Sequence, residues 1–241
     1  MVARKHFRTA ITSAELAANS GLLQYLQTFL TDNKKELFEK ALSLRTRFLA
    51  CVMENVIDEH NTNAVIRSCE CTGVQDVYII SGGKGFKPAK GVMRGSGKWS
   101  TLIRYNEAAG LSAEQCMNDL KNKGYRIVVT SPHGEATPLS MLEVSKPLAV
   151  CFGHEQTGIS QILKDHADEL VKIPMAGFTE SFNVSVAAGI ILYDLTRRIR
   201  NSNVNWNLSE PEKQQLRFEW TWKCLNRPDL LTEEYFRKQE K

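Results

Sequence analysis

The sequence lacks the long apolar runs and the metal-ligand spacings that would indicate a membrane protein or a metalloprotein. No apolar run approaches the roughly 20 residues that a membrane-spanning helix needs. The six cysteines show no C-x-x-C spacing and the five histidines are scattered, so no metal site is expected. Cys51 and Cys151 lie in apolar runs, as small core residues of a reducing compartment do.

Three common catalytic motifs are also absent. The sequence has neither the G-x-S-x-G element of many serine hydrolases nor a Walker A loop. Gly83 and Gly85 are followed by Pro88 where a dinucleotide-binding loop would have its third glycine. A Rossmann site is therefore disfavoured.

Charge is distributed unevenly along the chain. Residues 1–50 carry eight basic and four acidic residues, residues 197–241 carry ten and seven, and residues 51–196 carry thirteen and sixteen. Basic ends around a slightly acidic centre favour a polyanionic partner. Ordinary solvated helix faces are the alternative. The basic first fourteen residues lack the apolar centre of a secretory signal and can be an RNA-contacting arm or a transit peptide. We expect a cytoplasmic protein.

Strand and helix patterns alternate from residue 48 onward. This order predicts an α/β fold with a mostly parallel sheet and helices on both faces. Residues 13–44 and 205–241 show helical patterns. We therefore predict a helical extension over 1–46 that contacts RNA, an α/β domain over 47–200 and a second helical extension over 201–241. The expected strands are Phe48–Glu54, Asp76–Ile80, Thr101–Tyr105, Tyr125–Ser131, Leu148–Phe152 and Val171–Pro174; the expected helices between them are Ala64–Thr72, Ala113–Lys123 and Gln161–Glu169.

The segment Val171–Ile199 changes from a strand pattern to a helical one after Asn183. Ser181, Asn183 and Ser185 would lie at the start of that helix, where backbone N–H groups are free. One of them can simply cap the helix. Three polar residues at alternate positions also suit a loop that binds a ligand. Gly189 costs a helix roughly 1 kcal/mol relative to Ala, which indicates close packing against another segment.

Two other strand-to-helix junctions carry polar side chains. In Asn61–Arg67, Thr62 or Asn63 can cap the helix, and Arg67 would stay near the edge of the sheet where open α/β sheets bind ligands. An ion pair between Arg67 and Glu70 is the alternative. The second junction, Cys151–Ser160, contains two glycines, an acidic side chain at Glu155 and a possible cap at Ser160.

The segment from Lys84 to Lys98 is rich in lysine and glycine. This composition suits contact with a phosphate backbone, although a disordered surface loop has it too. With the basic ends of the chain, it leads us to expect RNA contacts at four positions: Lys90, Arg94, Lys98 and Arg45.

The sequence contains three motifs in this order: Asn61-x-x-Ala64-x-x-Arg67, Phe152-Gly153-x-Glu155-x-x-Gly158-x-Ser160, and Ile173-Pro174-Met175-x-Gly177 followed by Ser181-Phe182-Asn183-Val184-Ser185. Together they resemble the TrmH family of RNA ribose 2'-O-methyltransferases, within the SPOUT superfamily. Gly95–Trp99 also resembles that family, and Phe182 departs from it, since the family usually has Leu there.

The resemblance implies a homodimer that binds S-adenosylmethionine in a trefoil knot, with the helix holding Ala187–Gly189 near the dimer interface. The family's arginine is a proposed base, but a guanidinium keeps its proton in proteins, which makes positioning and polarising the ribose hydroxyl the simpler role for Arg67. The implied cofactor-binding residues are Thr130, Gly153, Ile173, Met175 and Phe182. The implied catalytic residues are Asn61, Arg67, Glu155, Ser181 and Asn183.

Short helical extensions resemble those of the tRNA enzymes that methylate the D-loop guanosine at position eighteen. About 45 residues precede the first strand, too few for the separate RNA-binding domain of many ribosomal-RNA enzymes. A ribose methyltransferase acting on rRNA or on another tRNA position is the alternative within the class. An RNA-binding protein without catalysis and a small-molecule methyltransferase are the alternatives outside it.

Overall fold

The computed structural model describes residues 13–56, 58–82, 95–106, 110–132 and 135–239. The chain divides into two compact units. The first is Arg45–Asn207, and the second joins residues 13–44 to residues 208–239. Most of the two predicted helical extensions thus belongs to one unit, whereas residues 45–46 and 201–207, predicted as parts of the extensions, belong with the sheet.

The first unit is built on a seven-stranded sheet in the order β3-β2-β1-β6-β4-β7-β5, and every adjacent pair is parallel. The predicted α/β class with a mostly parallel sheet is confirmed. The short strand β5 was not predicted, and the predicted threading through a trefoil knot stays a prediction. The strands are β1 (Leu49–Glu54), β2 (Asp76–Ser81), β3 (Thr101–Asn106), β4 (Arg126–Thr130), β5 (Thr137–Pro138), β6 (Leu148–Phe152) and β7 (Glu169–Lys172).

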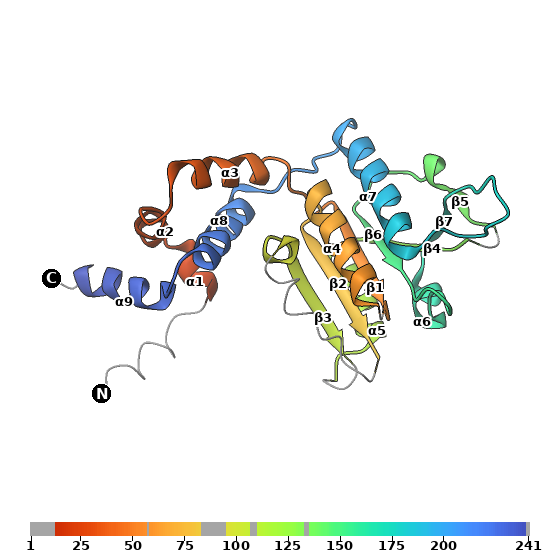
Figure 1. Ribbon diagram of the computed structural model, residues 1–241, viewed down its shortest axis with the longest axis horizontal. Coiled ribbons are helices and arrows are strands. Elements are labelled where there is room, and N and C mark those ends of the chain that lie inside the picture. Colours follow the sequence, from red (N-terminus) through yellow and green to blue (C-terminus); the bar gives the residue numbers. More distant parts are fainter. Residues whose placement is uncertain (1–12, 57, 83–94, 107–109, 133–134, 240–241) are drawn as a thin grey trace. The chain divides into compact units, whose positions relative to one another are not determined.

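Helices cover both faces of the sheet, as predicted. On one face α4 (Glu59–Thr72) and α7 (Val184–Arg200) lie side by side (Figure 1). On the other face lie α5 (Ala113–Asn122) and α6 (Gln161–His166). Alternate residues of β1 therefore enter different core clusters, with Cys51 facing α4 and α7 and Val52 facing α5 and α6. The described part of the unit also contains two short 3₁₀ turns, Ser96–Lys98 and Leu139–Met141.

Helix α4 begins five residues earlier than predicted. The side chain of Asp58 accepts a hydrogen bond from the Asn61 backbone N–H at 2.9 Å and caps the helix. The prediction that Thr62 or Asn63 caps it is therefore wrong, because Thr62 lies inside the helix and donates to the Val56 carbonyl at 3.0 Å. Because of this early start, Asn61 lies in the first turn, at the edge of the sheet.

The prediction that two cysteines lie in the core is confirmed. Cys51 and Cys151 are both fully buried on central strands. Burial raises the pKa of the Cys151 thiol well above its ordinary value, because the thiolate would lose its solvation. These thiols are therefore neutral packing groups.

The second unit consists of α1 (Ser13–Ala18), α2 (Ser20–Gln27), α3 (Asp32–Leu42), α8 (Glu210–Cys224) and α9 (Pro228–Gln239). Arg217 of α8 donates two hydrogen bonds to the Glu39 carboxylate of α3, at 2.6 and 2.8 Å. The helical pattern over 205–241 forms two helices, because Arg227 adopts a left-handed conformation (φ 57°) immediately before Pro228. Within the described residues no helix is both long and apolar enough to cross a bilayer.

Candidate active site

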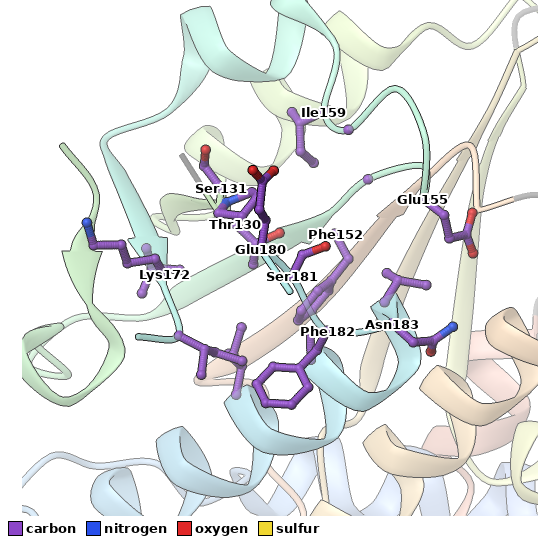
Figure 2. Close-up of a pocket in the computed structure, with 18 of the residues that line it drawn as sticks. Thr130, Ser131, Phe152, Glu155, Ile159, Lys172, Glu180, Ser181, Phe182 and Asn183 are labelled. Atoms are coloured by element: carbon purple, nitrogen blue, oxygen red, sulfur yellow. The ribbon is translucent and has the colours of Figure 1, made fainter. Parts of the chain in front are cut away.

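A pocket of about 320 Å³ lies at the carboxyl ends of β4, β6 and β7 and the start of α7 (Figure 2). Open parallel sheets bind ligands at this edge. All five residues predicted to bind the cofactor line this one pocket: Thr130, Gly153, Ile173, Met175 and Phe182. The structure therefore brings together residues from three separate stretches of the chain.

Gly153 allows the chain to turn sharply at the mouth of the pocket. A Cβ on Gly153 would lie 2.5 Å from the carbonyl carbon and oxygen of Gly158 and 2.7 Å from the Ile159 nitrogen. His154 and Gly158 close the turn through two backbone hydrogen bonds of 3.1 and 2.9 Å. Gly158 itself has a φ of +68°, which side chains disfavour. Both glycines are therefore required by the shape of this loop.

Glu54 anchors the other end of the same loop and was missed by the sequence analysis. Its side chain is only 3% exposed and accepts hydrogen bonds from the Ser160 N–H at 2.8 Å and from the Ser160 hydroxyl at 2.5 Å. Ser160 also caps α6, as predicted, by accepting from the Leu163 N–H. The available signal was an acidic residue at the end of an otherwise apolar strand. Buried carboxylates persist only when they are hydrogen-bonded.

A chain of hydrogen bonds connects residues from all three motifs. Asn61 Nδ2 donates to Glu155 Oε1 at 2.7 Å, and Asn183 Nδ2 donates to Asn61 Oδ1 at 3.1 Å. Asn183 Oδ1 in turn accepts from the Ser185 N–H at 2.9 Å and from its hydroxyl at 2.6 Å. Since a carboxylate only accepts, Glu155 determines how the Asn61 amide is oriented, and Asn61 then orients Asn183.

The three polar residues around the start of α7, Ser181, Asn183 and Ser185, have different surroundings. Asn183 is the N-cap of α7. Ser185 hydrogen-bonds to Asn183, whereas Ser181 is exposed and lines the pocket. The interpretation of this segment as more than a helix cap therefore agrees with the geometry.

Arg67 and Asn61 are the two predicted catalytic residues that do not line the pocket. Asn61 is hydrogen-bonded to Glu155, which does line it, whereas the Arg67 side chain is exposed on α4. It forms no ion pair with any residue that the structure describes. Glu70, its suggested partner, instead pairs with Arg45 at 3.1 Å. The Arg67 guanidinium is thus available to another molecule.

The predicted RNA contacts differ in their positions. Arg45 is buried, with its side chain 3% exposed and paired with Glu70, so it stabilises the fold and offers little surface to RNA. Lys98 is half-buried, and its ammonium lies 5.0 Å from the centre of the Trp99 ring. Lys90 and Arg94 fall outside the described residues.

Two charged pocket residues, Lys172 and Glu180, were also missed by the sequence analysis. Both line the cavity, and Glu180 is exposed there. The signal for Glu180 was its place directly before Ser181 in the third motif. Among the described residues, no group of three His, Cys, Asp or Glu side chains is arranged to hold a metal ion.

Comparisons with known proteins agree with this geometry. A family model described as the SpoU rRNA Methylase family matches residues 49–193. A tRNA (guanosine(18)-2'-O)-methyltransferase of Borreliella burgdorferi is 38% identical over 195 residues, covering 81% of this chain and 87% of that protein. The enzyme of the same name from Aquifex aeolicus is 30% identical over 204 residues, covering 83% and 93%.

Solved structures show the same fold. The crystal structure of the A. aeolicus TrmH/SpoU tRNA modifying enzyme has a TM-score of 0.72 at 30% identity, covering 81% of this chain and 98% of that one. AviRb of Streptomyces viridochromogenes, a SpoU methyltransferase solved with the cofactor AdoMet, shares the fold with a TM-score of 0.56 at 24% identity, covering 68% and 62%. The chain belongs to the SpoU rRNA methylase family.

Proposed function

We propose that this protein transfers a methyl group from S-adenosylmethionine to the ribose 2'-hydroxyl of the guanosine at position 18 of tRNA. The observation that carries the proposal is the convergence of the three motifs on one pocket and one hydrogen-bond chain. The named activity of two relatives that match most of this chain supports the substrate. A tRNA substrate also supports the cytoplasm as the compartment.

The residues of the pocket fit this methyl donor. Its volume of about 320 Å³ lies within the range of small-molecule sites. Phe152, Ile173 and Phe182 give it apolar walls for a nucleoside, and the tight turn at Gly153 leaves backbone atoms open to a ligand. When bound, the donor supplies an electrophilic methyl group on a sulfonium. We assign its binding to Thr130, Gly153, Ile173, Met175 and Phe182.

The hydrogen-bond chain from Asn183 through Asn61 to Glu155 gives the pocket a preorganised polar edge. A ribose hydroxyl is a weak nucleophile and must lose its proton as it attacks. Fixed amide and carboxylate groups next to the cofactor residues hold the hydroxyl in line with the methyl group. We assign Ser181 to the same task, since it lines the pocket and is exposed.

We further propose that the active form is a homodimer. Along α7 three apolar side chains are exposed at helical spacing, Val186 (48%), Ile190 (37%) and Tyr193 (65%). An exposed apolar stripe on a helix is best covered by a partner, and a second copy of the chain is the simplest one. Arg67, which is exposed and does not line its own pocket, would then position and polarise the ribose hydroxyl in the pocket of the second copy.

The RNA is held by basic side chains outside the pocket. We assign Lys90, Arg94 and Lys98 to the phosphate backbone, because lysine and arginine neutralise phosphates. The helical extension over 1–46 carries seven basic and four acidic residues, which supports its contact with the tRNA.

Transfer of labelled methyl from S-adenosylmethionine to tRNA transcripts tests this function. A transcript with guanosine at position 18 should accept one methyl group, and a transcript in which only that guanosine is replaced should accept none. Digestion to nucleosides should yield 2'-O-methylguanosine. Label at another nucleotide or only in ribosomal RNA would identify the rival ribose methyltransferase, and label in no RNA would exclude the proposal.

A further inference from the structure

Glu180 places a negative charge inside the pocket. It lies in the loop before α7 and lines the pocket, as Ser131 and Ile159 also do (Figure 2). It forms no ion pair or hydrogen bond with any other residue that the structure describes. The side chain is exposed, so the carboxylate is solvated while no ligand is bound.

The other charged side chains of the pocket do not neutralise Glu180. The Glu155 carboxylate accepts its hydrogen bond from Asn61. Lys172 extends from β7, and its ammonium points away from the Glu180 carboxylate (Figure 2). The pocket thus has one carboxylate without a partner among the residues that the structure describes, and this favours a ligand that carries positive charge.

The proposed methyl donor and its product differ by one positive charge. S-adenosylmethionine carries a sulfonium, an ammonium and a carboxylate, whereas S-adenosylhomocysteine carries only the ammonium and the carboxylate and is neutral overall. When the sulfur–carbon bond breaks, the electron pair stays on sulfur and the sulfonium becomes a neutral thioether. A nearby carboxylate stabilises the first ligand more than the second.

We infer that Glu180 is the residue by which this pocket prefers the cationic methyl donor over its neutral product. The inference rests on the proposed function and adds to it a specificity-determining residue. After each turnover the attraction to Glu180 weakens, so the product dissociates more readily and the donor replaces it.

Calorimetry with the purified full-length protein tests this inference. The variant Glu180→Gln keeps the shape of the side chain and removes only its charge. Three ligands are compared, S-adenosylmethionine, S-adenosylhomocysteine and sinefungin, in which an amine replaces the methylated sulfur. A partly exposed ion pair contributes up to about 1 kcal/mol. We therefore expect the variant to bind the donor and sinefungin about three- to fivefold more weakly, and the product less than twofold more weakly.

Glu114→Gln is the matched control, since it removes one exposed carboxylate at the start of α5, outside the pocket. It should leave all three dissociation constants unchanged. Raising the salt concentration should reduce the preference for the donor in the wild type and in this control, but not in Glu180→Gln.

The possible outcomes separate the two proposals. If Glu180→Gln bound all three ligands more weakly by the same factor, Glu180 would interact with a group that the donor and the product share, and the inference would be overturned. Unchanged affinities would overturn it as well. In either case the wild type still binds the donor and the proposed function stands. If the wild type bound none of the three ligands, the proposed function would fail, and the inference with it.

Discussion

Asn61 Nδ2 donates a hydrogen bond of 2.7 Å to Glu155 Oε1, although the two residues are 94 positions apart in the chain. The bond joins the first turn of α4 to the loop after β6. It exists because β1 and β6 are adjacent parallel strands, so the segments that follow them emerge at the same edge of the sheet. The central pairing of the sheet thus assembles the polar part of the site.

The first prediction concerns this bond. Asn61→Asp replaces the donor amide with a second carboxylate beside Glu155, so the two side chains repel each other and Asn183 loses its fixed partner. We expect methyl transfer to fall on the order of 10²-fold, as small displacements of catalytic groups do. Affinity for S-adenosylmethionine should change less than twofold, because Asn61 does not line the pocket. Initial rates and calorimetry measure both; undiminished turnover would remove Asn61 from the catalytic centre.

Several features of the fold could be read from the sequence because they depend on local patterns. The strand Leu148–Phe152 was predicted with its observed bounds, since it is a short apolar run between breaks. The start of α4 was placed wrongly because three polar residues compete for the cap, and Asp58, the first of them, takes it. Such competition is decided by the path of the chain, which the pattern does not contain.

The parts of the site that escaped prediction depend on partners distant in the chain. Glu54 was predicted only as the last residue of a strand. Its role could not be predicted, because its hydrogen-bond partner Ser160 lies 106 positions away in the chain. Arg45 was read as part of a basic, RNA-contacting surface, but Glu70 neutralises it in the interior. Glu180 was one of several polar residues in its loop, and only the cavity distinguishes it. Charge alone therefore does not tell a buried pair from a binding residue.

A second prediction follows from the crowding at Gly153. In Gly153→Ala the added methyl group would lie 2.5 Å from the backbone of Gly158, so the loop must shift. We expect a loss of about 1–3 kcal/mol of stability and a clear loss of affinity for S-adenosylmethionine. Urea unfolding and calorimetry measure these effects.

Gly189→Ala is the matched control for this prediction. A Cβ on Gly189 would lie 3.7 Å from the Ser68 hydroxyl, an ordinary contact, and alanine favours a helix by up to about 1 kcal/mol. Within one chain it should therefore leave stability unchanged or raise it. The steric argument is supported if Gly153→Ala loses stability and Gly189→Ala does not. It is contradicted if the two variants have the same free energy of unfolding.

The third prediction concerns the buried carboxylate of Glu54. Glu54→Ala leaves the Ser160 N–H and hydroxyl without their acceptor. We expect a loss of about 2–3 kcal/mol, as for buried hydrogen bonds to a charged group. Ser160→Ala should cost about 1 kcal/mol or more, since it removes both the helix cap and one of these bonds. The double variant should lose less stability than the sum of the losses in the two single variants. A loss equal to that sum in urea unfolding would show that the two residues do not interact.

The fourth prediction concerns contact with RNA. If Lys98 neutralises a phosphate, Lys98→Ala should weaken tRNA binding and reduce by about one the slope of log affinity against log salt concentration. Lys164→Ala is the control, since Lys164 is exposed on α6 and is not assigned to RNA. Filter binding between low and moderate salt measures the slopes. The same slope in Lys98→Ala as in the wild type would exclude this contact.

The fifth prediction concerns Arg67. Arg67→Ala should abolish methyl transfer while calorimetry shows unchanged affinity for S-adenosylmethionine, because the side chain lies outside its own pocket. Arg67→Lys should also be inactive if the planar guanidinium is needed to hold the hydroxyl or a neighbouring phosphate. Turnover retained in Arg67→Ala would refute an essential role.

A heterodimer distinguishes whether Arg67 acts on its own pocket or on that of the partner. One chain carries Arg67→Ala and the other Gly153→Ala, and two different tags select only mixed pairs. If Arg67 acts across the interface, the first chain's intact pocket receives the arginine of the second, and one site of two works. We then expect about half the wild-type rate, whereas either homodimer alone is inactive. An inactive heterodimer would place Arg67 at its own pocket, and a protein that elutes as an active monomer would overturn the proposed dimer.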